Sequence, residues 1–237
     1  MSEKDYRKLY LTQDKVLLEL KPALSSFYLT GGTALGRFYL NHRFSEDLDF
    51  FMNNSDTFNS TLRNVEKVLI NNFSLLKNQS VVYENFVRYY IEDNETVLKI
   101  EFVNDINYRC GEPNTYQFGF IDTPINILTN KLTAIVGRDE PKDIFDIYSI
   151  ASHYMFNWME IFNEVRNKAI INEIDVEQRI KSFPVQLLQK VDWHVQAVDP
   201  DDVNNAIQTI ANDFFLGLDN SLGANKPVIE DAIVICI

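Results

Sequence analysis

Hydrophobic residues recur along this chain with two different periods, and the change falls near residue 124. Between residues 27 and 121 most apolar runs are short and several alternate with polar residues, which is typical of strands. From residue 124 onwards the apolar residues return every three or four positions, which is the spacing of helices. The expected strands are residues 27–30, 48–50, 81–91, 96–103 and 116–121.

Helical spacing also predicts three helices among these strands. The first covers residues 5–24, the second follows two glycines and has Thr33 as its N-cap, and the third runs through residues 62–69. Mixed strands and helices followed by helices alone predict an α+β fold. We therefore expect an α+β domain over residues 1–123 and a helical domain over residues 124–237, with the helices of residues 124–150 contributing to the active site.

The overall charge limits the partners that this chain can bind. The chain has 237 residues, 46% of them apolar, so the core of one large domain or of two small ones can be filled. Its 22 Lys and Arg residues against 34 Asp and Glu residues give a formal net charge of −12. So acidic a surface excludes a protein that coats DNA through its phosphates, but it permits a local basic pocket.

Cysteine and histidine are too scarce for a disulfide framework or a zinc site. Neither Cys110 nor Cys236 has metal-site spacing, and no base stands near Cys110 to make it a nucleophile. We expect His42 to cap a helix end or to face solvent, and His153 and His194 to pack among apolar residues. The charged N-terminus lacks a signal core, and no apolar run approaches the ~18 residues of a membrane span, so a soluble cytoplasmic protein is expected.

The stretch from residue 29 to residue 50 carries the strongest indication of chemistry. Gly31 and Gly32 join a strand to a helix, so backbone N–H groups can approach an oxyanion, and the helix N-terminus adds further donors. Asp47 and Asp49 are two residues apart on the next strand, so both side chains project from one face. Such a pair repels unless a cation lies between, and Mg²⁺ takes oxygen ligands of this kind. Each feature alone is commonplace, but together they are the minimum apparatus for metal-assisted phosphoryl or nucleotidyl transfer.

These residues match the first motif of a known enzyme family. The motif reads Gly-Gly-Ser/Thr, a helix, then Arg-x-Ser/Thr-x-Asp-hydrophobic-Asp, and here it is carried by Gly31, Gly32, Thr33, Arg43, Ser45, Asp47 and Asp49. The chain thus resembles the DNA polymerase β-type nucleotidyltransferases. More closely, it resembles their AbiEii branch, the toxins of type IV toxin–antitoxin and phage abortive-infection systems. The later motifs of that branch resemble Lys131 to Arg138 and Lys142-Asp143 to Asp146, so the resemblance covers residues 27–150.

The resemblance implies a polymerase β-type domain that transfers NMP from an NTP to a hydroxyl and releases pyrophosphate. The acceptor would be a tRNA 3′ end or a protein side chain, and a cognate antitoxin would be encoded nearby. The implied catalytic residues are Asp47, Asp49, Glu101, Lys131 and Asp143. The implied ligands of Mg²⁺ or Mn²⁺ are Asp47, Asp49 and Glu101. The implied nucleotide-binding residues are Gly31, Gly32, Thr33, Arg43, Ser45, Arg138 and Asp146.

Helical spacing independently groups the later charged residues. Lys131 and Arg138 are seven residues apart on one helix face, a pair suited to a polyphosphate chain. Asp143 and Asp146 are three apart and also share a face. The alternative interpretation is that all four form a solvated salt-bridge stripe.

The third carboxylate has a weaker signal. Residues 98–103 alternate so that Lys99 and Glu101 share one face of a strand, opposite the apolar residues. Enzymes of the superfamily place a carboxylate on such a following strand, where it shares a metal or acts as a general base. Glu101 is therefore the candidate, and an ion-paired edge position is the alternative.

Two other functions are compatible with the same residues. One is transfer of a nucleotide onto a small molecule, as in the aminoglycoside-modifying members of the superfamily. The other is a nucleotide-binding regulatory protein that has kept the pocket and lost turnover. The sequence leaves the base of the NTP, the acceptor and the oligomeric state open.

Overall fold

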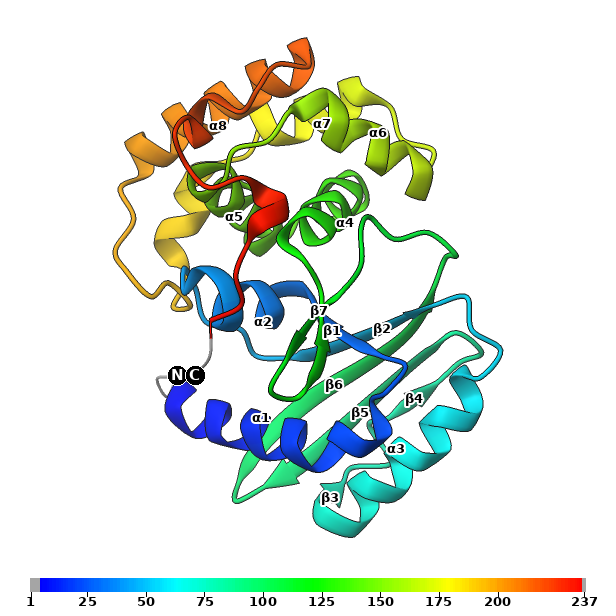
Figure 1. Cartoon of the computed structure of the whole chain (residues 1–237). Helices are drawn as coiled ribbons and strands as arrows, with labels where there is room; N and C mark the ends of the chain where they lie inside the picture. The colour runs from blue at the N-terminus through cyan, green and yellow to red at the C-terminus, as the bar shows by residue number, and fades with distance from the viewer. Residues whose placement is uncertain (1–4, 236–237) are drawn as a thin grey trace.

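A mixed eight-stranded β-sheet lies at the centre of one half of the molecule (Figure 1), and the computed structural model describes residues 5–235. The strands are β1 (Tyr28–Thr30), β2 (Leu48–Asn53), β3 (Ser74–Leu75), β4 (Val81–Val82), β5 (Phe86–Asp93), β6 (Thr96–Asp105), β7 (Asn114–Tyr116) and β8 (Gly119–Ile121). Their order is β3-β5-β6-β2-β1-β8-β7, and β4 pairs with β5. Strand β2 is antiparallel to β1 and parallel to β6. The aspartate-bearing strand therefore lies in the middle of the sheet.

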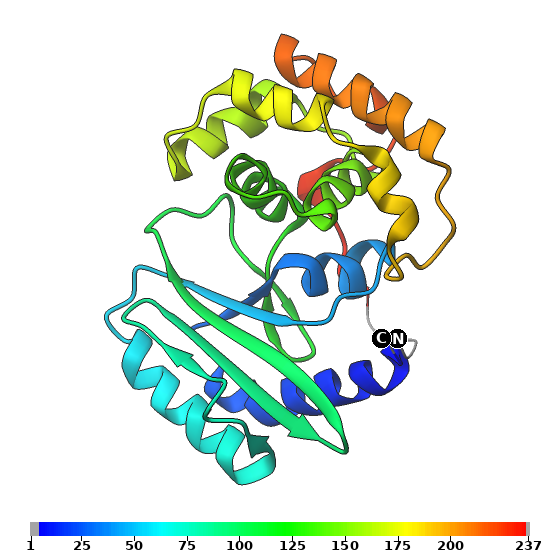
Figure 2. The same cartoon turned by 180° about the vertical axis from the view of Figure 1, so that it is seen from behind.

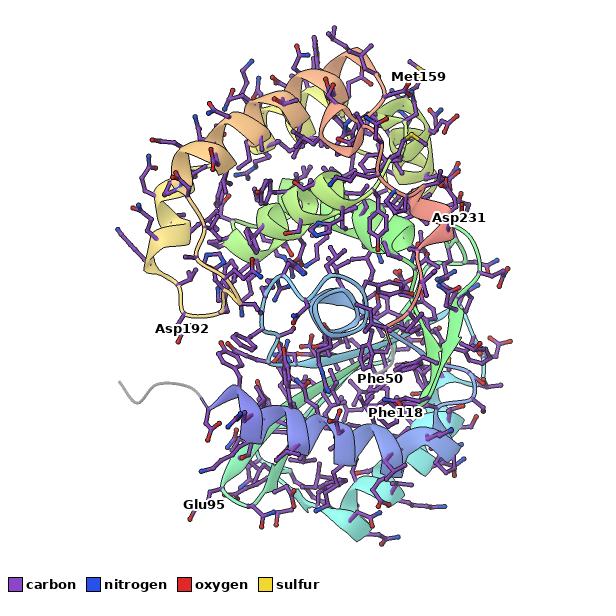
Figure 3. All side chains as sticks on the ribbon, turned by 60° about the vertical axis from the view of Figure 1, so that its left-hand side comes forward. Phe50, Glu95, Phe118, Met159, Asp192 and Asp231 are labelled. Atoms are coloured by element: carbon purple, nitrogen blue, oxygen red, sulfur yellow. The ribbon has the colours of Figure 1, made fainter. Side chains whose placement is uncertain are left out.

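The two faces of β2 have different surroundings. Leu48, Phe50 and Met52 are buried, and the Phe50 ring stacks on Phe102 of β6 with 5.2 Å between ring centroids. Helices α1 (Tyr6–Leu20) and α3 (Phe58–Asn72) cover this face, and side chains fill the space between α1 and α2, where Phe50 lies (Figure 3). The opposite face carries the polar residues of β2. Alternation of a half-buried strand thus turns the acidic side chains away from this core.

The remaining helices lie on the other side of the sheet (Figure 2). They are α2 (Gly31–Leu35), continued by the π-helical turn η2 (Gly36–Leu40), α4 (Pro124–Gly137), α5 (Pro141–His153), α6 (Trp158–Lys168), α7 (Glu173–Lys181) and α8 (Pro200–Leu216). The short 3₁₀ helices are η1 (Lys21–Ala23), η3 (Val185–Lys190), η4 (Ser221–Gly223) and η5 (Ile229–Asp231). Helix α2 lies between the sheet and the α4–α5 pair (Figure 1). The last described residue returns to this layer, since the Ile235 N–H donates to the Phe38 carbonyl at 2.7 Å.

Proline and capping residues mark where several helices begin. Pro124, Pro141 and Pro200 each occupy the first position of a helix, where the missing N–H costs nothing. Thr123 accepts a hydrogen bond from the Asn126 N–H and so caps α4.

Three local predictions are wrong, and one strand was not predicted. Thr33 is not an N-cap, because α2 already begins at Gly31, and the Thr33 hydroxyl instead donates to the Asp47 carbonyl. The run 81–91 forms two strands, because residues 83–85 turn the chain. The run 116–121 is a hairpin whose second strand starts at Gly119, with φ +129°, a value that favours glycine. Strand β3 was not expected, since its two residues are too short for a visible period.

The predicted α+β fold, a mixed sheet with flanking helices followed by a helical region, is confirmed. All strands of the described chain lie between residues 28 and 121, and only helices and isolated bridges follow. A division into two domains at residues 123 and 124 stays a prediction. Within residues 5–235 no helix is long and apolar enough to span a bilayer.

Candidate active site

The Gly31–Gly32 turn touches the acidic face of β2. Gly31 has φ +69°, and a Cβ there would lie 2.7 Å from the Asp49 carboxylate oxygen Oδ2. A Cβ on Gly32 would lie 2.2 Å from Nη2 of Arg43. Both distances are shorter than any real Cβ contact, so only glycine lets the backbone pass between the Asp49 carboxylate and the Arg43 guanidinium. Glycine is therefore required for a different contact at each of the two positions.

Three carboxylates lie at the N-terminal end of β2, where the strand begins. Asp49 is paired in register with Glu101 of β6, and Asp47 lies just before the strand. Burial raises the pKa of Asp49 to about 7, and the negative charges of Asp47 and Glu101 add to this rise. Within residues 5–235 no side chain donates a hydrogen bond to the Asp49 carboxylate. A partly neutral, unpaired aspartate between two other carboxylates is suited to receive a cation.

Two basic side chains hold the other two carboxylates. Lys99 Nζ lies 2.8 Å from Asp47 Oδ2 and 3.5 Å from Glu101 Oε1. Arg88 Nε donates to Glu101 Oε1 at 2.6 Å. Burial would lower the pKa of Lys99, but its bonds to Asp47 raise it above the ordinary value. Lys99 is therefore a protonated cation beside the carboxylates.

The donor set fits a divalent cation in its chemistry. Carboxylate oxygens are the ligands that Mg²⁺ and Mn²⁺ accept. As the described side chains stand, no three His, Cys, Asp or Glu residues are arranged to hold a metal ion. Asp47 is paired with Lys99, so its carboxylate would have to leave that ammonium to share a cation with Asp49. The expectation that Asp47, Asp49 and Glu101 hold the metal stays a prediction.

Lys131 is buried between two aspartates of the next helix. Its Nζ lies 2.7 Å from Asp143 Oδ1 and 2.6 Å from Asp146 Oδ2. Arg138 donates to the other oxygen of Asp143 at 2.6 Å. The solvated salt-bridge stripe is therefore wrong: the ion pairs exist, but Lys131, Asp143 and Asp146 are all buried.

Arg43 completes this network from the side of the glycine turn. Its Nε and Nη2 donate to the two oxygens of Asp146 at 2.6 and 2.8 Å, a bidentate pair. Burial would raise the pKa of Asp146, but Arg43 and Lys131 hold it well below its usual range. The network thus contains three positive charges, on Arg43, Lys131 and Arg138, and two negative charges, on Asp143 and Asp146. The cluster keeps one excess positive charge.

Four predicted nucleotide-binding residues lie behind the pocket wall. The guanidinium of Arg43 and the side chain of Ser45 lie beneath Gly32. Asp146 is fully buried against Arg43, and the Thr33 hydroxyl is used by the Asp47 carbonyl. None of these four side chains lines the pocket, so they support the site from within the protein.

The prediction for His42 is wrong. His42 neither caps a helix nor faces solvent; its side chain is 5% exposed, and Nε2 lies 2.8 Å from Asp146 Oδ1. Burial lowers its pKa, so the imidazole is neutral at pH 7. His153 bonds the Ser149 carbonyl, and His194 packs edge-on against Phe145.

The cysteines add no reactive group to the described chain. Burial raises the pKa of the Cys110 thiol to about 12, which keeps it protonated at neutral pH. Cys236 lies outside the described residues.

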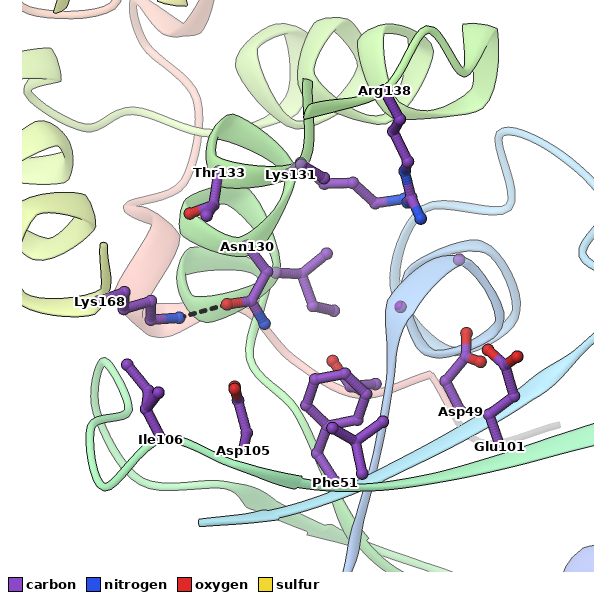
Figure 4. Close-up of a pocket in the computed structure, with 16 residues that line it drawn as sticks. Asp49, Phe51, Glu101, Asp105, Ile106, Asn130, Lys131, Thr133, Arg138 and Lys168 are labelled. Carbon is purple, nitrogen blue, oxygen red and sulfur yellow. Dashed lines mark hydrogen bonds between the residues drawn. The ribbon is translucent and has the colours of Figure 1, made fainter. Parts of the chain in front are cut away.

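One pocket of about 360 Å³ joins the acidic strand face to α4 (Figure 4). Asp49 and Glu101 rise from the sheet at one side, and the side chains of Lys131 and Arg138 reach toward them from above. Six of the predicted residues line it, namely Gly31, Gly32, Asp49, Glu101, Lys131 and Arg138. A single cavity is therefore lined by the Gly31–Gly32 turn, by the carboxylates of Asp49 and Glu101, and by the cationic side chains of Lys131 and Arg138.

Comparison of the sequence with known protein families gives a match to one of them. The sequence profile described as "Nucleotidyl transferase AbiEii toxin, Type IV TA system" matches residues 16–220. The chain belongs to the AbiEii nucleotidyltransferase toxin family. As a member of that family it is a nucleotidyltransferase. Among curated protein sequences no match is found.

Solved structures share the fold of this AbiEii-family chain. JHP933 from Helicobacter pylori superposes with a TM-score of 0.58 at 23% sequence identity, covering 89% of this chain and 92% of that one. MenT4, the nucleotidyltransferase toxin Rv2826c from Mycobacterium tuberculosis H37Rv, gives a TM-score of 0.55 at 15% identity, covering 95% and 86%. At these identities the likeness concerns the fold alone.

Several pocket residues of the AbiEii-family chain were not identified from the sequence. Phe51 and Asp105 could have been, because they continue the alternation of Asp49 and Glu101 along β2 and β6. Asn130 precedes Lys131 directly on α4. Lys168 ends α6, thirty-seven positions after Lys131, and nothing in its local sequence indicates that it reaches the pocket.

Proposed function

We propose that this chain transfers the NMP group of an NTP, with the help of Mg²⁺ or Mn²⁺, to a hydroxyl group on a macromolecule, and that it acts as the toxin of a toxin–antitoxin pair. The observation that carries this proposal is the shared pocket in which the Gly31 backbone touches Asp49 and faces Lys131 and Arg138. Family membership supports the toxin role.

In this proposal the glycine turn and the two cationic side chains bind the triphosphate. Backbone N–H groups at the start of α2 are free of helical partners and can donate to phosphate oxygens. Arg138 is 58% exposed at its side chain, so its guanidinium can donate to a ligand in the pocket. Lys131 is positioned by Asp143 and Asp146, and its charge acts across the same cavity.

Asp49, Asp47 and Glu101 would hold the divalent cation. When bound, the cation neutralises phosphate charge and polarises the reacting phosphoryl group. Lys99 holds Asp47 and Glu101 in place before the cation arrives, because its ammonium bonds both. The acceptor hydroxyl gives its proton to one of these carboxylates and its oxygen bonds to the α-phosphorus. The bond between the α-phosphorus and the bridging oxygen breaks, and pyrophosphate leaves. Positioning and charge account for the catalysis, since phosphoryl transfer needs little covalent help from a protein.

The acceptor in this proposal is a tRNA 3′ end or a hydroxyl-bearing protein side chain. A formal net charge of −12 disfavours extensive contact with RNA phosphates, so in this proposal the RNA contact is confined to the end that enters the pocket. A basic cognate antitoxin would suit the same acidic surface.

The direct test incubates the protein with each α-³²P-labelled NTP, Mg²⁺ or Mn²⁺, and one of three acceptors: tRNA, total protein or an aminoglycoside. Label on tRNA or protein, absent with the Asp49→Asn variant, is the expected result. Label on the aminoglycoside alone would favour a small-molecule transferase. NTP binding without transfer to any acceptor would favour a regulatory protein.

A further inference from the structure

The pocket continues beyond the carboxylates along the sheet, and the register of β2 and β6 divides this floor into three rows. The cross-strand pairs are Asp49 with Glu101, Phe51 with Val103, and Asn53 with Asp105. Successive same-face rows are about 7 Å apart, because each residue of a strand advances about 3.3 Å. The floor thus passes from an acidic row to an apolar row and ends at Asp105.

The apolar row is suited to a flat ring. Phe51 lies on the pocket floor between Asp49 and Asp105 (Figure 4), and Ile127 of α4 also lines the cavity. Aromatic side chains stack on nucleobases of any identity. If the phosphates lie at the glycine turn, as the proposed function requires, the nucleoside extends over Phe51 toward Asp105.

Two unpaired polar groups of opposite kind stand at this far end. The Asp105 carboxylate points from the sheet into the pocket, and the Asn130 amide points down from α4 (Figure 4). Within the described chain neither the Asp105 carboxylate nor Nδ2 of Asn130 has a hydrogen-bond or ion-pair partner. The carboxylate can only accept hydrogen bonds, and Nδ2 can only donate them.

Lys168 fixes which end of the Asn130 amide faces the cavity. Its Nζ lies 2.5 Å from Asn130 Oδ1 and 2.7 Å from Thr129 Oγ1. An ammonium donates and cannot accept, so it requires the amide oxygen and turns Nδ2 the other way. Burial lowers the pKa of Lys168 to about 8, which leaves it protonated at neutral pH. Lys168 is a positioning residue for Asn130.

We propose that Asp105 and Asn130 select the base of the nucleotide, favouring a base with an exocyclic amino group beside an acceptor atom over uracil. Cytosine, adenine and guanine each offer an amino group to the carboxylate and a neighbouring acceptor to Nδ2. The single N–H of uracil lies between two carbonyl oxygens, which the Asp105 carboxylate repels. This inference rests on the proposed function, because it assumes that the triphosphate occupies the glycine turn.

The test is calorimetric titration of ATP, CTP, GTP and UTP, each with Mg²⁺, into the wild-type chain and three variants. In wild type the best-bound amino-bearing nucleotide should bind at least about tenfold more tightly than UTP, as expected for one well-matched base contact. In Asp105→Asn the ratio of these two affinities should fall to about threefold or less, because an amide can also donate to a uracil carbonyl. Lys168→Met should lower the ratio as well, since Asn130 is then free to turn. The exposed Asp56→Asn variant carries the same charge change away from the pocket and should keep the wild-type ratio.

Two outcomes would overturn the inference. One is equal affinity of wild type for UTP and for the best of the other three, with binding still dependent on Mg²⁺ and on Asp49; this would leave the proposed function standing. The other is a ratio that Asp105→Asn leaves unchanged. If wild type binds no NTP in the presence of Mg²⁺, both the inference and the proposed function fail.

Discussion

At the scale of single residues, the two glycines of the turn have different neighbours. A side chain at Gly31 would strike the Asp49 carboxylate, whereas one at Gly32 would strike the Arg43 guanidinium. The sequence predicted both glycines as a phosphate seat because glycine permits close backbone approach. It could not show that Gly32 also covers a buried ion pair, since Arg43 is eleven residues away and its partner Asp146 lies on another helix.

The first prediction concerns this packing. Gly32→Ala should destabilise the protein by about 1–3 kcal/mol, because the added methyl group displaces the guanidinium that is bonded to Asp146. Gly137→Ala is the matched control, since no atom lies within 4 Å of a Cβ there and its φ is not positive. Urea unfolding of both variants measures the difference. A cost for Gly32→Ala no larger than that of Gly137→Ala would contradict the described contact.

The second prediction concerns Asp49 and pH. The pKa of Asp49 is raised to about 7 in the folded protein, from an ordinary value of 3.8. The folded state therefore binds the Asp49 proton more tightly than the unfolded state does. Proton binding thus adds to the free energy of unfolding at low pH, and this contribution is lost as the pH rises from 4 through 7. Asp49→Asn mimics the protonated form, so its melting temperature without metal should exceed that of wild type by an amount that grows over this range.

Asp47→Asn is the control for this prediction, because the Asp47 carboxylate already has Lys99 as its partner. This variant should lose an ion pair and gain no stability at pH 8. Thermal melts of the two variants and wild type at pH 4.5, 6 and 8 in EDTA distinguish the outcomes. If the melting temperatures of Asp49→Asn and wild type differ by the same amount at all three pH values, Asp49 titrates at its ordinary pKa and the prediction is contradicted.

At the scale of elements, the α4–α5 pair connects the glycine turn to the cationic wall of the pocket. Arg43 comes from the segment between η2 and β2, Lys131 from α4, and Asp146 from α5, and all three meet in one buried network. Helical periodicity correctly placed Asp143 and Asp146 on one face of α5, where both contact Lys131. It was wrong for Arg138, which follows the end of α4 in extended backbone and does not share a helix face with Lys131. Periodicity describes one helix at a time, so it could not show that Lys131 and the two aspartates face each other across a helix interface. That missing step is why a solvated stripe remained an alternative.

The third prediction tests this network. Asp146→Asn should destabilise the fold by about 3–5 kcal/mol, because it leaves buried Arg43 and Lys131 with one carboxylate fewer. Asp139→Asn removes an exposed carboxylate, 85% accessible, from its pair with Arg179 and should cost less than about 1 kcal/mol. Both values come from chemical denaturation. Similar values for the two variants would mean that the buried ion pairs contribute no more than a surface pair.

At the scale of the whole molecule, the change of period near residue 124 corresponds to the passage from sheet to helices. The last strand, β8, ends at Ile121, and α4 begins at Pro124. The pocket lies between these two parts, because β2 and β6 form its floor and α4 its opposite wall. Lys131 and Arg138 line this pocket. The contribution of residues 124–150 to an active site stays a prediction.

What the sequence could not show is how the far end of the pocket is built. Lys168, Asn130 and Asp105 come from α6, α4 and β6, and only the packing of these three elements brings them together. The near end could be predicted because its residues are close in sequence: the glycine turn and the paired aspartates lie within twenty residues of one another. Spacing along the sequence can predict a site whose residues are neighbours in the sequence, but contacts between distant elements become known only from the structure.

Metal-dependent NTP binding at Asp49 is tested by the affinity for an NTP with and without Mg²⁺, measured by calorimetry on wild type and Asp49→Asn. We expect wild type to bind the NTP at least about tenfold more tightly with Mg²⁺ than in EDTA, because the cation joins the carboxylates to the phosphates. For Asp49→Asn we expect nearly equal affinities under the two conditions. An Asp49→Asn variant that keeps the full Mg²⁺ dependence of wild type would contradict the assignment of this pocket as the active site.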